Sequence, residues 1–397
     1  MSLDLAAIRA QFPALAHYTW FQNGGVSITP SPVAAEHARL MAELLERGPL
    51  HIVYPNEEYP RRARTMERLA RFFGVEAGEL ALMRGVSEGF LTVLRGIEWQ
   101  PGDRVVLSCD EEAALLLPCL HLRDRRGVEI VKAPLRADPD EAVDAVTQLL
   151  TPRTRLLALS HVTTDVGYRF PLVDICAAAR ERGVWTFADL AHSVGLMPLN
   201  LHELGCDFAG ILSYKWMYAP YASGALYVRR DLVEQLPVTY AGGRAESRLD
   251  FEADEYELHA TSERFQFGPW SWPLVHAWAR AADWLEEAGL EAIWDRTRSL
   301  AGRLKQGLAQ VPGARLYTPA AAEMSAALVS LGLGGWRGAD LASRLRQRGM
   351  VVKPLPHGRE GLRVSLPFFA LEEEVDRLLC ELALAAEDKP GALAPGN

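Results

Sequence analysis

The stretch from Trp185 to Arg229 determines the fold that we expect, and it reads WTFADLAHSVGLMPLNLHELGCDFAGILSYKWMYAPYASGALYVR. One apolar run ends in Asp189, with His192 three residues later, and a second apolar run ends shortly before Lys215. Short apolar runs without alternation are typical of strands that are covered on both faces. We therefore expect the acid and the amine at the strand ends of an open α/β sheet, where ligands bind.

A lysine that forms a Schiff base, with an aspartate facing a pyridinium nitrogen, is the contribution that a protein makes to pyridoxal 5'-phosphate (PLP) chemistry. The chain offers few candidates for that lysine, namely Lys132, Lys215, Lys305, Lys353 and Lys389. Of these, only Lys215 follows a buried run that is matched by a nearby aspartate. The sequence therefore predicts PLP as the cofactor and Lys215 as its attachment point.

The composition limits the class of protein. A chain of 397 residues with 49% apolar and 23% charged residues is typical of a globular protein with two domains and a terminal arm. A net charge of −9 argues against nucleic acid and against an anionic membrane surface. The five scattered cysteines lack CxxC spacing, which favours reduced, cytoplasmic cysteine over disulfides or a metal site. No apolar run is long enough to predict a transmembrane helix.

The motif Asp-x-x-His, the lysine 26 residues after the aspartate, Pro220 and the strand GALYVR together resemble the class-V aminotransferases. These are fold-type I PLP enzymes that include cysteine desulfurases, kynureninases and isopenicillin N epimerase-like proteins. The similarity runs from about Tyr18 to about Leu379. The segment SHVT, followed shortly by glycine, resembles the isopenicillin N epimerase-like branch more than the desulfurase branch.

The resemblance implies an α/β fold with a mostly parallel, seven-stranded-type sheet, flanking helices and a smaller α+β C-terminal domain. The alternation of expected strands and helices agrees with βαβ units. We expect an N-terminal arm at 1–30, a large PLP-binding domain at 31–270, a small domain at 271–386 that can include parts of the arm, and a disordered tail at 387–397. A homodimer is also expected, because the aromatic segment Phe265–Trp272 is rich in residues that anchor interfaces.

A turn after the strand Leu80–Met83 is the expected phosphate site. A helix begins near Val86, and backbone N–H groups at a helix N-terminus bind phosphate well. The resemblance implies that Gly85, Val86 and Ser87 cradle the cofactor phosphate, with the Ser87 hydroxyl among the donors.

Around the cofactor ring, the resemblance implies that Asp189 keeps the pyridine nitrogen protonated. It places Thr164 and His192 near the phenolic oxygen. Tyr214 stands where the family usually has histidine, which could tune proton transfer or reflect simple packing.

Several positions depart from the family pattern. Ala113, flanked by Glu112 and Ala114, occupies the position of a ring-stacking aromatic or histidine, and a shift of one residue would place Glu112 there. Leu212 and Pro269 replace polar residues that usually contact the phosphate, and proline offers neither a hydroxyl nor an N–H donor. Ser213 is the residue expected to compensate.

Two residues are expected to bind the substrate. The resemblance places Arg363 at the α-carboxylate of an amino acid, and a planar guanidinium suits bidentate carboxylate binding. Asn23 is expected to assist. The alternatives are a surface arginine on a strand and an asparagine that only caps a turn.

The reaction is the least determined expectation. Related desulfurases carry a cysteine in the loop before the final arginine strand, whereas here that loop reads KPLPHGREG, which excludes desulfuration through a persulfide on that loop. We expect a C–S lyase or an aminotransferase that acts on a modified amino acid, in secondary metabolism. A decarboxylase, oxidative deaminase or epimerase on the same scaffold stays open, as does a catalytically silent binding or regulatory protein. A nicotinamide enzyme is a weaker alternative, because no G-x-G-x-x-G follows the first strand.

Overall fold

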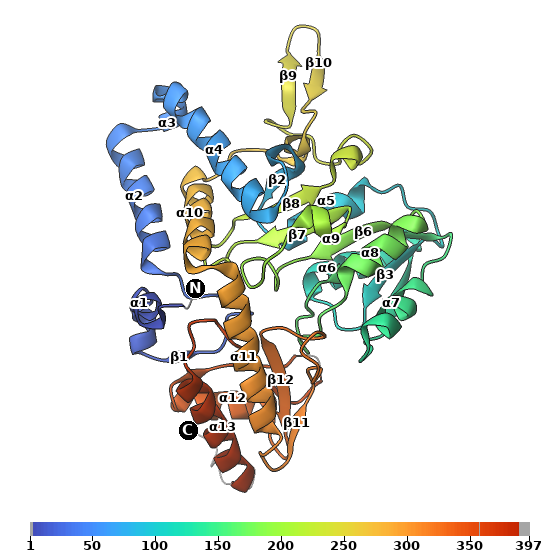
Figure 1. Cartoon of the computed structure of the whole chain (residues 1–397). Coiled ribbons are helices and arrows are strands. Elements are labelled where there is room, and N and C mark those ends of the chain that lie inside the picture. Colours follow the sequence, from blue (N-terminus) through green and yellow to red (C-terminus); the bar gives the residue numbers. More distant parts are fainter. Residues whose placement is uncertain (1–2, 357, 389–397) are drawn as a thin grey trace, which may run out of the picture. The chain divides into compact units, whose positions relative to one another are not determined.

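The computed structural model describes residues 3–356 and 358–388, which fall into two compact units (Figure 1). The smaller unit contains the described parts of Met1–Ile28, Val162–Phe170 and Ala288–Asn397, and the larger unit contains Thr29–His161 and Pro171–Glu287. The boundary expected at residue 270 therefore differs from this division. Helix α10 (Trp272–Ala288) belongs almost entirely to the larger unit, where its buried Trp278 packs on Phe73.

The larger unit is built on a seven-stranded sheet in the order β2-β8-β7-β6-β5-β3-β4. Its strands are β2 (Leu80–Met83), β3 (Arg104–Ser108), β4 (Glu129–Ala133), β5 (Thr154–Ser160), β6 (Trp185–Asp189), β7 (Phe208–Leu212) and β8 (Gly224–Val228). Only β8 runs antiparallel to its neighbours within this sheet. The mostly parallel α/β sheet predicted from the sequence is confirmed.

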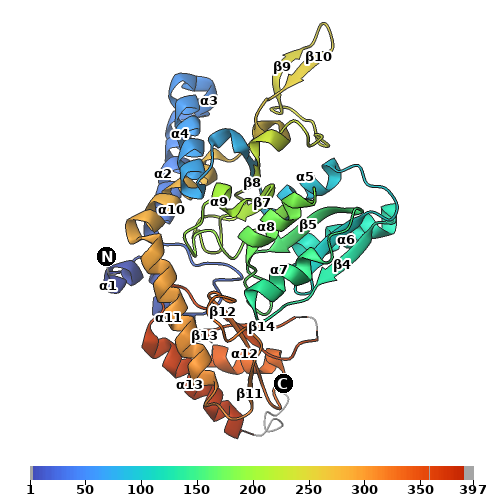
Figure 2. The same cartoon turned by 45° about the vertical axis from the view of Figure 1, so that its right-hand side comes forward.

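Helices cover the sheet in two groups that each pack among themselves (Figure 2). The first group is α5 (Val86–Gly96) and α6 (Ala113–Arg126), and the second is α7 (Pro139–Thr147), α8 (Leu172–Glu181) and α9 (Leu201–Leu204). The chain passes from β3 outward to β4 and then returns to β5 on the other side of β3. This reversal makes the carboxyl ends of β3 and β5 a topological switch point, where open α/β sheets form their ligand crevice.

The rest of the larger unit includes a helical layer and a β-hairpin (Figure 1). The helices are α2 (Ser31–Arg47), α3 (Leu50–Val53), α4 (Pro55–Phe73) and α10, and short 3₁₀ turns lie at Ala77–Glu79, Arg230–Leu232 and Ser262–Phe265. The hairpin pairs β9 (Glu246–Asp250) with β10 (Glu255–Leu258) and was not predicted. The sequence pattern missed it because side chains on both of its faces are largely exposed and do not alternate.

The smaller unit has an antiparallel sheet in the order β11-β12-β15-β14. These strands are β11 (Ala314–Leu316), β12 (Leu328–Leu333), β14 (Lys353–Pro354) and β15 (Leu362–Ser365), and β1 (Thr19–Trp20) pairs with β13 (Met350–Val351). Its helices are α1 (Leu5–Ala10), α11 (Leu290–Leu308), α12 (Gly338–Gln347) and α13 (Glu372–Glu387), with a 3₁₀ turn at Pro13–Ala16. Of the tail expected at 387–397, residues 389–397 lie outside the described residues.

Candidate active site

Neighbouring strand ends of the larger unit bring the predicted acid and amine together. Strand β6 ends at Asp189, and the adjacent strand β7 ends three residues before Lys215. Both side chains are buried, with exposed fractions of 4% and 8%. Burying an acid and an amine is costly, so their shared location indicates a functional site.

His192 lies between Lys215 and Trp216. The Nζ atom of Lys215 is 3.2 Å from Nε2 of His192, and the indole N–H of Trp216 donates to Nδ1 of His192 at 3.3 Å. A neutral imidazole whose Nδ1 accepts carries its proton on Nε2. That proton then points to the Lys215 nitrogen, an arrangement that is satisfied when the lysine is a neutral amine.

A glycine allows this arrangement. Gly195 has a φ of +77°, and a Cβ atom there would lie 2.3 Å from the carbonyl oxygen of Trp216. Because glycine lacks Cβ, the turn that carries His192 can lie against the backbone beside Lys215.

We therefore expect Gly195→Ala to destabilise the chain by more than the cost of placing alanine at a positive φ. Gly183 is a matched control, because its φ of +65° is similar and nothing lies within 4 Å of the Cβ position. Gly183→Ala should cost about 1–2 kcal/mol, and Gly195→Ala about 2 kcal/mol more, because backbone must move. Urea unfolding of both variants measures the difference. Equal losses would show that the close contact costs nothing.

Asp189 is held in place by its own turn. Its Oδ1 atom accepts the backbone N–H of Ala191 at 2.8 Å. Burial raises the pKa of Asp189 to about 6, although Lys215 and the Ala191 N–H both lower it. A protonated pyridine nitrogen beside this carboxylate would favour its ionised form.

The loop after β7 fixes the position of Lys215. The Ser213 hydroxyl donates to the carbonyl of Pro220, and the Ser223 hydroxyl donates to Ser213 at 2.8 Å. Ser213 therefore shapes the loop, and its proton is not directed to a phosphate in the way we expected. Within the same loop Tyr218 and Ala222 have φ values of +56° and +60°, a strained conformation that is concentrated at functional sites.

Tyr214 packs on Tyr221, with ring centroids 4.7 Å apart and an interplanar angle of 17°. Burial raises the pKa of the Tyr214 phenol, and the nearby Tyr221, Glu112 and Asp189 act in the same direction. The phenol therefore stays neutral over the physiological pH range. Ring stacking with Tyr221 is compatible with both the packing and the proton-transfer interpretation of Tyr214.

The predicted phosphate turn lies at the N-terminus of α5. Gly85 precedes the helix with a φ of +152°, and a Cβ atom at Gly224 would come within 3.0 Å of the Gly85 Cα atom. The two glycines thus allow the turn to lie against β8, and Ser87 beside it is exposed. Glu88 in the first helical turn is paired with Arg84 at 2.7 Å, which reduces its repulsion of an anion.

These features fit PLP. The larger unit offers an amine for attachment, a carboxylate for a ring nitrogen, and helix N–H groups with a hydroxyl for a phosphate. Each is a donor or acceptor of the kind that the corresponding part of the cofactor needs.

The smaller unit contains the other three predicted site residues, namely Asn23, Thr164 and Arg363. One Arg363 nitrogen donates to both the carbonyl and the hydroxyl oxygen of Thr164, each at 2.9 Å. Arg363 is 1% exposed, which excludes a surface arginine. Asn23 is also fully buried, and the neighbouring Gln22 forms a β-bridge with Ser365. Thr164, expected near the phenolic oxygen, thus contacts the arginine.

Two residues were missed by the sequence analysis. Trp216 was missed although it follows Lys215 directly. Glu111 was missed because the ring-stacking position was expected at Ala113, with Glu112 as the alternative. In the structure Ala113 begins α6 and is exposed, whereas Glu111 is bonded to Ser160. The sequence did contain one indication of a role for Glu111, because this residue follows the end of a buried strand.

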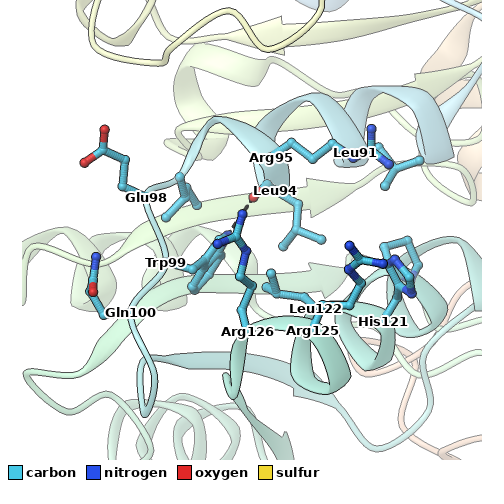
Figure 3. Close-up of a pocket in the computed structure, with 12 residues that line it drawn as sticks. Leu91, Leu94, Arg95, Glu98, Trp99, Gln100, His121, Leu122, Arg125 and Arg126 are labelled. Atoms are coloured by element: carbon cyan, nitrogen blue, oxygen red, sulfur yellow. Dashed lines mark hydrogen bonds between the residues drawn. The ribbon is translucent and has the colours of Figure 1, made fainter.

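A cavity of about 830 Å³ lies elsewhere in the larger unit (Figure 3). Residues near the C-terminal ends of α5 and α6 line it, including Leu94, Arg95, Trp99, Arg125 and Arg126. The indole N–H of Trp99 donates to the carbonyl of Leu94 at 2.7 Å. None of the predicted site residues lines this cavity, and the phosphate turn is at the opposite end of α5.

Comparisons with known proteins agree with this site. The sequence model of the class-V aminotransferases matches residues 57–378. The cysteine desulfurase of Salmonella agona (strain SL483) is 30% identical, over 80% of this chain and 80% of that protein. The cysteine desulfurase of Cronobacter sakazakii is 27% identical, over 96% of this chain and 98% of that protein.

Solved structures are also similar. A mutant of C-DES with glycine covalently linked to its PLP cofactor has a TM-score of 0.87 and is 25% identical, covering 94% of this chain and 98% of that chain. The cystine C–S lyase C-DES in complex with its reaction product cysteine persulfide has a TM-score of 0.86, covering 94% and 99%.

The fold and site define a PLP-dependent enzyme of fold type I. The chain belongs to the class-V aminotransferase family, as its motifs predicted. In the part of the chain that the structure describes, no helix combines the length and the apolar character needed to cross a membrane.

Proposed function

We propose that this enzyme is a C–S lyase that cleaves the Cβ–S bond of a cysteine derivative such as cystine. The Cα–H bond breaks first, the sulfur then leaves Cβ with the electron pair, and a Cα=Cβ bond forms. Water converts the released 2-aminoacrylate to pyruvate and ammonia. When bound, PLP supplies the electron sink that makes the Cα–H bond acidic.

The observation that carries the lyase assignment is the absence of cysteine from Lys353–Gly361. The two relatives described above are named cysteine desulfurases, but the loop where such enzymes carry a nucleophilic thiol has none here. In a disulfide substrate such as cystine, the sulfur that leaves Cβ is already bonded to a second sulfur. It therefore leaves as a persulfide, and no thiol of the protein is needed to accept it. The name of the related C-DES, a cystine C–S lyase, agrees with this proposal.

The residues of the larger unit have distinct roles in this proposal. Lys215 holds the cofactor and, once displaced by a substrate amine, takes the proton from Cα. The 3.2 Å contact with His192 keeps the amine oriented. Asp189 stabilises the proton on the ring nitrogen.

We further propose that Arg363 binds the substrate α-carboxylate and that Asn23 assists. Thr164 fixes one guanidinium nitrogen through two hydrogen bonds, which orients the planar group for bidentate binding.

Arg363→Lys should therefore weaken amino-acid binding by about 1.5–3 kcal/mol, because an ammonium cannot replace the bidentate fork. Spectral titration of the bound cofactor with amino acids measures the affinity, and cofactor content should stay normal. Wild-type affinity in this variant would place the carboxylate elsewhere.

The function is tested by incubating the purified enzyme with cystine and with cysteine. Cystine should yield pyruvate, ammonia and a persulfide in equal amounts. Cys109 and Cys380 are the exposed cysteines among the described residues, so their serine variants serve as controls. Unchanged turnover in both supports a lyase, whereas loss of turnover in either would indicate sulfur transfer through a protein thiol. Release of a keto acid that retains the sulfur would indicate an aminotransferase.

A cytoplasmic homodimer is the form that we propose. Within the segment expected at the interface, Phe265 is buried in the core of its own unit, whereas Phe267 is exposed. Large apolar side chains are also exposed along α2 and α3, including Leu45 and Ile52. An exposed apolar patch of this kind favours protein association. Light scattering should give twice the monomer mass, and Ile52→Asp should shift the protein towards monomer.

A further inference from the structure

Glu111 places a second acidic side chain in the crevice of the larger unit. One carboxylate oxygen accepts the backbone N–H of Ser160 at 3.0 Å, and the other accepts the Ser160 hydroxyl at 2.7 Å. Glu111 follows β3 and Ser160 ends β5, so the two hydrogen bonds span the topological switch point of the sheet. This is the position at which open α/β sheets bind their ligands.

The same contact brings Glu111 close to the acid that is proposed to face the ring nitrogen. Ser160 is the register partner of Asp189 on the neighbouring strand, and paired strands lie about 5 Å apart. The backbone N–H of His161 also donates to the Asp189 carbonyl at 2.9 Å. Ser160 therefore links the two acids: it donates hydrogen bonds to Glu111, and it lies beside Asp189 on the neighbouring strand.

We propose that Glu111 is a proton-holding residue of the cofactor site: its carboxyl group stays protonated beside the ionised Asp189, so that a single negative charge faces the ring nitrogen. The inference rests on the proposed PLP site. One carboxylate balances one protonated ring nitrogen, whereas a second negative charge close to Asp189 would repel it. Glu111 does not touch the reacting atoms in this proposal, and it acts through Asp189 as a positioning residue.

The surroundings of Glu111 support the protonated state. Burial raises the pKa of Glu111 to about 7, the Asp189 charge adds to this, and the Ser160 hydrogen bonds oppose it. Its neighbours along the chain and on α6 are Glu112 and Cys119. Burial raises the pKa of the Cys119 thiol, which therefore stays neutral. The cation on the same side is Lys215, which acts on Asp189.

The sign of the pH dependence follows from the raised pKa. The unfolded chain loses the Glu111 proton near pH 4.5, whereas the folded chain keeps it to about pH 7. The free energy of unfolding of the cofactor-free chain should therefore fall as pH rises through this window. Asp189 contributes below about pH 6, and His276, whose pKa burial lowers to about 4, gives a change of opposite sign up to about pH 6.5. The Glu111 contribution is therefore the difference between wild type and Glu111→Gln over the interval from about 6 to 7.

Glu111→Gln tests the proposal, because the amide resembles the neutral acid and can still bond to Ser160. Urea unfolding of the cofactor-free variant should lose the fall in stability between about pH 6 and 7. In the loaded enzyme, the absorbance of bound PLP should lose a pH-dependent step in the neutral range, and turnover at pH 6 should stay within about twofold of wild type. Glu112→Gln, which removes a charge from the same loop, should keep both features.

A second variant covers the case in which Glu111→Gln does not fold. Ser160→Ala removes a hydrogen bond that favours the ionised Glu111, so the midpoint of both measurements should rise by about half a pH unit or more. A step that persists in Glu111→Gln, or a midpoint that does not move in Ser160→Ala, overturns the proposal. Failure of PLP to attach to Lys215 would refute the proposed function instead, and the cofactor-free unfolding data would still test Glu111.

Discussion

Lys215→Ala should abolish covalent attachment of PLP and lower turnover by at least about 10⁴-fold, because the same amine carries the cofactor and takes the Cα proton. Its place after β7, its burial and its 3.2 Å contact with His192 all support this double role. Borohydride reduction of the wild type followed by peptide mapping should find the pyridoxyl group on Lys215. The variant should incorporate none.

Lys305 provides the matched control. It is also partly buried, and burial lowers its pKa to about 8, which makes it the rival nucleophile by reactivity. Its ammonium, however, donates to the Pro319 carbonyl at 2.7 Å and to the Ser325 hydroxyl, so its environment suits a structural cation. Lys305→Met should keep both cofactor and turnover. A pyridoxyl group on Lys305, or a pyridoxyl-labelled peptide from the reduced Lys215→Ala protein, would contradict the assignment.

Local sequence pattern correctly predicted that Asp189 and Lys215 lie at the ends of buried strands. Asp189 and Lys215 follow unbroken apolar runs, and such runs are buried strands wherever they fall in a doubly wound sheet. The turn at Gly85 could also be predicted from the sequence, because the short strand, the glycine and the apolar helix are consecutive in the chain. In each case the residues that define the feature lie within about one element of one another.

Glu111 could not be predicted in the same way. Its significance comes from Ser160, 49 residues later, and from the return of the chain to β5 beside β3. The sequence shows only three acidic residues after a strand, a pattern that is usually a solvated loop. Which of them turns inward is decided by tertiary packing, so the expectation fell on Glu112 and Ala113.

The smaller unit gives a second example of contacts that local sequence pattern cannot predict. Arg363 was predicted from the resemblance of its segment to the family, and it is buried on its strand. Its bonds to Thr164 span 199 residues and depend on the loop 162–170 lying against β12. Gly167 in that loop lies close to Leu328, and no local sequence pattern could predict this contact because the two residues are far apart in the chain.

Asp189→Asn should slow removal of the Cα proton by about 10³-fold, or about 4 kcal/mol, while leaving amino-acid binding within about threefold of wild type. The asparagine Oδ1 can still accept the Ala191 N–H, so the turn should hold its shape. A neutral amide, however, cannot stabilise a proton on the ring nitrogen, and the cofactor then withdraws electrons less strongly. Exchange of the Cα proton for deuterium, followed by NMR with a non-eliminating amino acid, measures this step directly.

The same variant also makes a prediction about stability that does not depend on turnover. Because burial raises the pKa of Asp189 from 3.8 to about 6, the folded cofactor-free chain keeps a proton that the unfolded chain has lost. The free energy of unfolding of the wild type should therefore fall as pH rises between these values, and the Asp189 part of that fall should be absent in Asp189→Asn. Arg363→Lys is the contrasting control, since it should weaken binding of the amino acid and leave the exchange rate at saturation nearly unchanged. If Asp189→Asn exchanged the Cα proton at the wild-type rate, the ring nitrogen would have to find its partner elsewhere, and the central pairing of Asp189 with Lys215 would be wrong.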